Sequence, residues 1–165
     1  MTCRKNLFVR NLSKYWELSE ITSALNEFKA KLDGRLLSKK LENVWDKGSK
    51  VLNRLLEIVA LNFSLQIWDL LKQMKNVLQE DLSGKPEWVK NIKEELQNIY
   101  KRLNKQEVSS ALYEYAVLLE EKGLYTQAVI ALQVCVETIV AENDGLTYDQ
   151  FVDYEWMQNY GKKSF

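Results

Sequence analysis

The stretch from Ser109 to Glu142 constrains the fold most, because it holds two apolar helical stripes separated by one glycine. Glycine takes the left-handed conformation that ends many helices, so a helix is predicted to stop at Gly123 and a second one to follow it. The stretch is therefore predicted to be an antiparallel helical hairpin. Its first stripe is Leu112, Tyr115, Ala116 and Leu119, and its second is Ala128, Val129, Leu132, Cys135, Val136, Ile139 and Val140.

The second helix of this hairpin is apolar over more than half of its circumference. A helix of that kind is typically buried on most sides. We therefore predict that it is the most buried helix, with the other helices packed round it. On this reading a charge introduced at Ala128 or at Val136 should unfold the domain.

The remainder of the chain also has a helical period. We predict helices from Ser19, as N-cap, to Gly34, and from about 36 to 60. The latter contains Gly48, which indicates a kink or a close helix crossing. A third runs over 62–79, where Asn62 or Ser64 breaks the chain or one long bent helix continues. Further helices are predicted after Pro86 and over 148–160.

The predicted fold class is all-α, a bundle of six to seven helices round the hairpin at about 109–142. Residues 1–16 show a brief alternation of apolar and polar residues and no helix cap, which predicts an arm or a short extended segment. Residues 17–165 are predicted to form a single helical domain, either complete or a fragment of a larger protein.

The sequence contains no histidine. This excludes Ser–His–Asp and Cys–His triads, metal sites that need histidine, and acid–base catalysis by imidazole. The two cysteines have no pairing or zinc-binding pattern, and no glycine-rich phosphate loop is present. We therefore predict no catalytic residue, no metal and no cofactor. Neither a long apolar run nor a signal-peptide pattern is found, which favours a cytoplasmic protein without a membrane segment.

The formal net charge is zero but unevenly distributed. Residues 1–60 hold 12 Lys and Arg against 7 Asp and Glu, whereas residues 106–165 hold 3 against 10. A basic front and an acidic back suit head-to-tail association or an oriented partner. The same asymmetry is also compatible with neutralisation inside the fold.

Two low-specificity candidate surfaces follow from charge and aromatic residues. A basic stretch on one predicted helix could follow a nucleic-acid backbone, or it could be a solvated face that includes Glu42 and Asp46. The acidic, aromatic C-terminal end could dock a protein partner, or it could cap the core. The nucleic-acid candidates are Arg35, Lys39, Lys40, Lys47, Lys50 and Arg54, and the partner-binding candidates are Tyr154, Trp156 and Tyr160.

The hairpin resembles one tetratricopeptide unit. Six residues fall where that repeat places a small, a large, a turn, an aromatic, a small and a large residue. In that order they are Ala116, Leu119, Gly123, Tyr125, Ala128 and Leu132. No second copy follows at a period of about 34 residues. The resemblance covers about a fifth of the chain and implies a helical adaptor that binds a peptide or a protein.

Residues 15–142 resemble the helical HEPN-type portion of CRISPR-associated type III accessory proteins. The similarity lies in the order of the segments ELSEITSALNEF, VLNRLLEIVALN, GKPEWVKNIKEEL and ALYEYAVLLEEKGLYTQAVIALQVCVE. The resemblance implies an all-α, dimeric protein whose relatives cut RNA with an Arg followed four to six residues later by His. This chain has no His and no Arg after Arg102, so no catalytic residue is transferred to it.

Three hypotheses result. The first is a non-catalytic HEPN-like domain of a CRISPR-associated accessory protein, acting through dimerisation or through association with RNA or protein. The second is a tetratricopeptide-like adaptor for a protein or peptide. The third is a metal-independent RNase that works without histidine and needs a Glu or Lys of shifted pKa. The expected partners are a second copy or another protein, with RNA as a further candidate.

Overall fold

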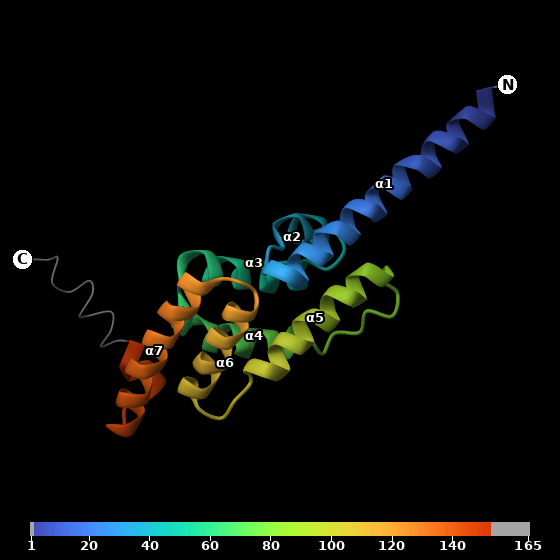
Figure 1. The fold of residues 1–165 in the computed structure, drawn as a ribbon. Helices are drawn as coiled ribbons and strands as arrows, with labels where there is room; N and C mark the ends of the chain where they lie inside the picture. Colours follow the sequence, from blue (N-terminus) through green and yellow to red (C-terminus); the bar gives the residue numbers. More distant parts are fainter. Residues whose placement is uncertain (1, 153–165) are drawn as a thin grey trace, which may run out of the picture.

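The computed structural model describes the backbone of residues 2–152 and the side chains of residues 12–152, and it confirms the all-α class. The described residues are 79% helical, and no strand occurs among them. Figure 1 shows α1 extending away from a body formed by the other helices. The elements are α1 Thr2–Lys31, α2 Arg35–Leu41, α3 Asp46–Leu61, η1 Ser64–Gln66, α4 Ile67–Val77, α5 Glu87–Leu103, α6 Val108–Glu121 and α7 Tyr125–Asn143.

The N-terminal segment is a continuous helix, so the short extended piece expected within residues 1–16 is not present there. Ser19 lies inside α1 and does not cap it. The helix ends one turn from the predicted stop, because Leu32 and not Gly34 takes the left-handed conformation, with φ of 55°. Within residues 12–31 of α1, the stretch 12–20 is exposed and the buried side chains are Ile21, Ala24, Leu25 and Phe28.

The helix predicted over 36–60 is two helices, α2 and α3, joined by a turn. The indole of Trp45 folds back over the first turn of α3 and is buried. A Cβ atom at Gly48 would lie only 2.1 Å from Cε3 of that indole, so glycine is required for the ring to lie there. The close approach predicted at Gly48 therefore exists, but it is made by an aromatic ring and not by a crossing helix.

Glu80 connects this turn to the loop before α5. Its carboxylate accepts a hydrogen bond from Nε1 of Trp45 at 2.9 Å and forms an ion pair with Lys47. The hydrogen bonds from Lys47 and Trp45 lower the pKa of Glu80 below its usual 4.5. The charged carboxylate is thus favoured in the folded state.

This arrangement predicts acid sensitivity. A carboxyl group with a lowered folded pKa contributes stability above its unfolded pKa and loses it as the pH falls through the folded pKa. Glu80→Gln should therefore cost about 1 kcal/mol near neutral pH, as for a partly exposed ion pair, and progressively less as the pH falls below the usual 4.5 of this carboxyl group. Urea unfolding of both chains at about pH 7 and about pH 3 measures this difference. An equal deficit at both pH values would contradict the assignment.

The remaining breaks follow the sequence closely. Asn62 takes φ of 56° and ends α3, so the predicted interruption is confirmed and the single long helix is wrong. Pro86 immediately precedes the first residue of α5. Gly123, at φ of 74°, joins α6 and α7 into the predicted hairpin.

The centre of the core is α6, not α7. Most of the side chains of α6 are buried, including the ring of Tyr115, which is only 1% exposed. Helix α6 contacts α4, α5 and α7, and Figure 1 shows α7 on the outside of this group. The prediction that the second hairpin helix is the most buried one is therefore wrong.

Candidate functional site

Helix α7 turns its small residues inward and its large apolar residues outward. The buried side chains on this helix are Ala128, Ala131, Cys135, Thr138 and Ala141. Small side chains allow two helix backbones to approach closely, so this side fits against α6. The exposed side is lined by Tyr125, Val129, Leu132, Val136, Ile139 and Val140, and we call these six residues the α7 face.

The α7 face is unusual because it is both apolar and open. Its side chains are between 42% and 67% exposed, with Tyr125 the most exposed and Leu132 the least. Scattered exposed apolar residues are normal in soluble proteins, whereas a contiguous apolar surface marks an interaction site. Six such residues on one side of one helix form a contiguous apolar surface.

The spacing of these residues adds a second indication. From Tyr125 to Ile139 they recur at alternating intervals of four and three residues, and Asn143 continues the series. This is the heptad spacing of helices that pack against another helix. Val129 and Val136 then occupy a positions and Leu132 and Ile139 occupy d positions, so all four core positions of this heptad series are apolar.

One end of the α7 face opens into a groove of about 500 Å³. Val136 and Val140 belong to both, so the two surfaces are continuous. The floor includes Phe151, which is 6% exposed. The full lining is Val136, Glu137, Val140, Ala141, Asp144, Leu146 and Phe151.

The chain after α7 is fixed in place by Tyr148. Its hydroxyl lies 3.0 Å from both the carbonyl oxygen of Leu65 and Oδ2 of Asp69. Its ring lies against Trp68, with centroids 6.4 Å apart, and beneath the ammonium group of Lys72. The residues that follow α7 are therefore held against α4, which gives the groove a defined shape.

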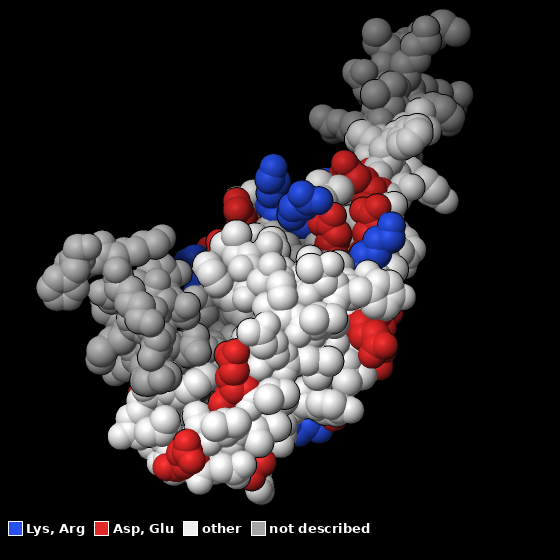
Figure 2. Space-filling view, turned by 60° about the vertical axis from the view of Figure 1, so that its left-hand side comes forward, with Lys and Arg blue, Asp and Glu red and all other residues white. Residues whose placement is uncertain are grey.

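Helix α7 itself contributes no positive charge to the surface round the α7 face. No Lys or Arg occurs between Gly123 and Phe151, and the acidic residues of α7 are confined to its C-terminal third, at Glu137 and Glu142. Figure 2 turns this side of the molecule forward and shows a broad uncharged surface with isolated acidic residues. A partner for this surface therefore needs apolar side chains and no strong negative charge.

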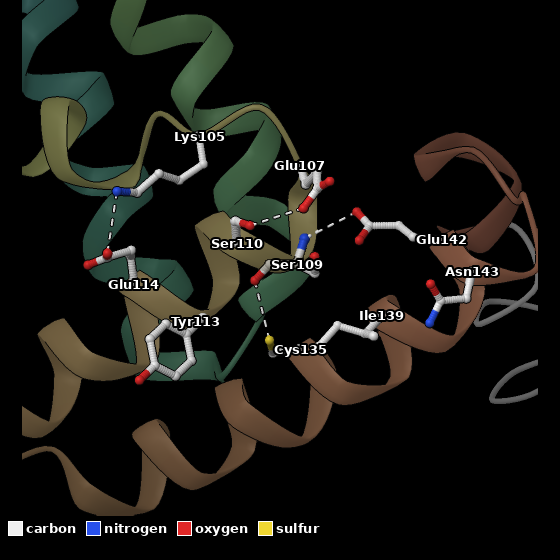
Figure 3. A pocket seen from close by; sticks show the side chains of 10 residues that line it. All are labelled: Lys105, Glu107, Ser109, Ser110, Tyr113, Glu114, Cys135, Ile139, Glu142 and Asn143. Atoms are coloured by element: carbon white, nitrogen blue, oxygen red, sulfur yellow. Dashed lines mark hydrogen bonds and ion pairs between the residues drawn. The ribbon is translucent and has the colours of Figure 1, made fainter.

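A second hollow, of about 670 Å³, lies between α6 and the C-terminal half of α7 (Figure 3). Its charged side chains are already used by the fold. Oε1 of Glu142 accepts hydrogen bonds from the backbone N–H groups of Val108 and Ser109, at 3.1 and 3.2 Å, and so caps the start of α6. Lys105 forms an ion pair with Glu114 at 3.3 Å.

Cys135, in the same hollow, is not an activated nucleophile. Its Sγ donates a hydrogen bond to the carbonyl oxygen of Ser109 at 3.3 Å. Burial, and to a smaller extent the charge of Glu142, raise the pKa of the thiol above its usual value. The neutral thiol is therefore favoured, and an unreactive structural cysteine is the result.

The predicted nucleic-acid residues lie on two helices and not on one. Arg35, Lys39 and Lys40 belong to α2, and Lys47, Lys50 and Arg54 belong to α3. All of them except Lys39 form ion pairs, which matches the alternative of a solvated face of mixed charge. The pairs are Arg35 with Asp33, Lys40 with Glu20, Lys47 with Glu80, Lys50 with Asp46, and Arg54 with Glu57.

Three further expectations concern the C-terminal partner-binding residues, metal binding and membrane-spanning helices. The predicted partner-binding residues Tyr154, Trp156 and Tyr160 lie outside the described residues. Within residues 12–152, no group of three or more Cys, Asp or Glu side chains is placed to hold a metal ion. Among the described helices, none has the length and apolar character that crossing a membrane requires.

Comparison of the chain with models of protein families, with curated proteins and with solved structures finds no match.

The predicted stripe contains five of the six residues of the α7 face and assigns them to the core, whereas Tyr125 precedes that stripe. The signal that could have separated the two sides is the distribution of side-chain size. Alanine, cysteine and threonine occupy one side, and valine, leucine, isoleucine and tyrosine occupy the other. A helix side made of small residues indicates that another helix of the same domain, here α6, approaches it closely.

Proposed function

We propose that this chain is a non-catalytic helical association domain that binds a protein partner along the α7 face. The observation that supports this most directly is the outward orientation of six large apolar side chains at heptad spacing. Burying such a surface on a partner releases about 25 cal/mol for each Å² of apolar area removed from water. In the described residues, most ionisable groups of the two hollows serve structural contacts, which gives no support to an enzyme.

Both sequence resemblances are compatible with this proposal. A HEPN-like domain of a CRISPR-associated accessory protein would use the α7 face to associate, and a tetratricopeptide-like adaptor would use the hairpin formed by α6 and α7. We favour the first as the biological setting because its similarity covers more of the chain. A cytoplasmic location belongs to the same proposal.

RNA is a weaker candidate partner than a protein. Phosphate binding by the basic residues of α2 and α3 would have to compete with their existing ion pairs, such as Lys50 with Asp46 at 2.7 Å. Those exchanges reduce the gain from each phosphate contact. Of the six basic candidates, only Lys39 has no ion pair among the described residues. The α7 face, by contrast, has apolar area that no residue of its own helix pair covers.

Site-specific photo-crosslinking in the organism that encodes the chain tests the proposal. A photoreactive amino acid at position 136, on the α7 face, should give a protein adduct. The matched control is position 18, because Leu18 on α1 is 56% exposed and Val136 is 59% exposed. Position 18 lies on α1, which extends away from the body that contains α7 (Figure 1), and should give no such adduct.

The mass of the adduct shows whether the α7 face contacts another protein. A larger species from position 136 alone supports association along the α7 face, whatever protein the added mass represents. The absence of any larger species, or a crosslink that stays within one chain, would overturn the proposal. Equal adducts from positions 18 and 136 would also contradict it, since they would show no preference for the α7 face.

A further inference from the structure

We infer that the partner of the α7 face is a second copy of this chain, with the two α7 helices antiparallel. This inference rests on the proposed function and specifies its partner. A twofold axis perpendicular to α7 would make the same surface serve both subunits, as in most soluble dimers. Three features of the described residues support it: the register of the apolar residues, the charge along α7, and the groove at one end.

The register pairs five of the six side chains of the α7 face across the axis, and the sixth, Val140, lies at the groove. Centring the twofold axis near Val134 places Val129 opposite Ile139 and Leu132 opposite Val136 of the second copy. Tyr125 then lies opposite Asn143 of the second copy. The paired segment from 125 to 143 is about 27 Å long, at 1.5 Å for each residue. Each a position meets a d position, which is the pairing that antiparallel helices with heptad spacing make.

Charge favours the antiparallel orientation over the parallel one. The segment from Tyr125 to Val136 carries no charged residue, and Glu137, Glu142 and Asp144 follow it. Parallel helices would bring both acidic ends together. In the antiparallel pair, each acidic end lies beside the N-terminal half of the partner helix, where the helix dipole is positive.

The groove supplies a site for the one aromatic ring of the α7 face. Tyr125 is 67% exposed at the start of α7, and the groove of about 500 Å³ lies at the end of the same helix, beside Val140 and Leu146. An antiparallel twofold pair places each Tyr125 at the groove of the other copy. Aromatic rings seated in pockets are the usual anchors of protein interfaces.

Light scattering over about a hundredfold range of concentration tests for the dimer. The expected mass rises toward twice the 19.4 kDa of one chain. Val136→Lys should raise the dissociation constant at least about tenfold, because it places two like charges beside the axis. The control Leu18→Lys should leave the constant unchanged. Tyr125→Ala should weaken the dimer, whereas Tyr15→Ala, on α1, should not.

Cysteine crosslinking tests the orientation. In a Cys3→Ser background, chains carrying Val129→Cys are mixed with tagged chains carrying Ile139→Cys. The antiparallel pair predicts a mixed disulfide-linked dimer between the two variants and little product from either variant alone. Self-linked dimers from each variant would instead show parallel helices and overturn the inference.

These outcomes separate the inference from the proposed function. A chain that stays monomeric up to about 100 µM overturns the second copy as partner. If position 136 nevertheless gives an adduct of a mass other than twice that of the chain in cells, the proposed function stands and a different protein is the partner. A crosslink within one chain, for example to residues 153–165, contradicts both.

Discussion

Replacing Ala128 with arginine should unfold the domain, whereas replacing Val136 with aspartate should leave it folded. Ala128 is 5% exposed and packs against α6, while Val136, eight residues later on the same helix, is 59% exposed. An unpaired buried charge costs about 3–5 kcal/mol, which is a large part of the 5–15 kcal/mol that stabilises a typical domain. An exposed substitution usually changes stability by less than about 0.5 kcal/mol.

Thermal unfolding followed by circular dichroism measures both effects. We expect no cooperative transition for Ala128→Arg and a transition within a few degrees of the original for Val136→Asp, at protein concentrations low enough to keep the chain monomeric. Unfolding of both variants would mean that α7 is buried on all sides, as its sequence predicts. Stability of both would mean that the hairpin of α6 and α7 is not formed as described.

The helices themselves could be predicted from the sequence because their causes are local. The stop at Gly123 follows from the backbone freedom of glycine, and the break at Asn62 follows from the tolerance of asparagine for the left-handed conformation. The turn between α2 and α3 could not be found in this way. It depends on the indole of Trp45 folding over Gly48 and bonding to Glu80, a residue 35 positions away.

The candidate site shows a different limit of the sequence. A helical period indicates that a helix has an apolar side, but it does not state which molecule covers that side. The apolar residues of α7 were therefore assigned to the core of the same chain. The structure shows that the small side chains of α7 complete the core, and that Val129, Val136 and Ile139 are exposed among the described residues.

Replacing Gly48 with alanine should cost about 2 kcal/mol, although alanine is the better helix former. At an exposed helix position this change would stabilise by about 1 kcal/mol. At Gly48 the new methyl group would lie 2.1–2.5 Å from three ring atoms of Trp45. That ring is 4% exposed and held by Glu80, so it has no free space in which to move. Overfilling a packed site typically costs about 1–3 kcal/mol. Urea unfolding measures the loss.

Gly84→Ala is the matched control, because a Cβ atom at Gly84 would have no other atom within 4 Å. It should be neutral or slightly stabilising, since alanine restricts the unfolded chain. The double variant Gly48→Ala with Trp45→Ala isolates the contact. If the ring causes the loss, the two changes should cost less together than the sum of their separate effects. Additive effects would mean that Gly48 is required by the backbone of α3 and not by the indole. In that case the turn between α2 and α3 would not depend on the packing of Trp45 over glycine.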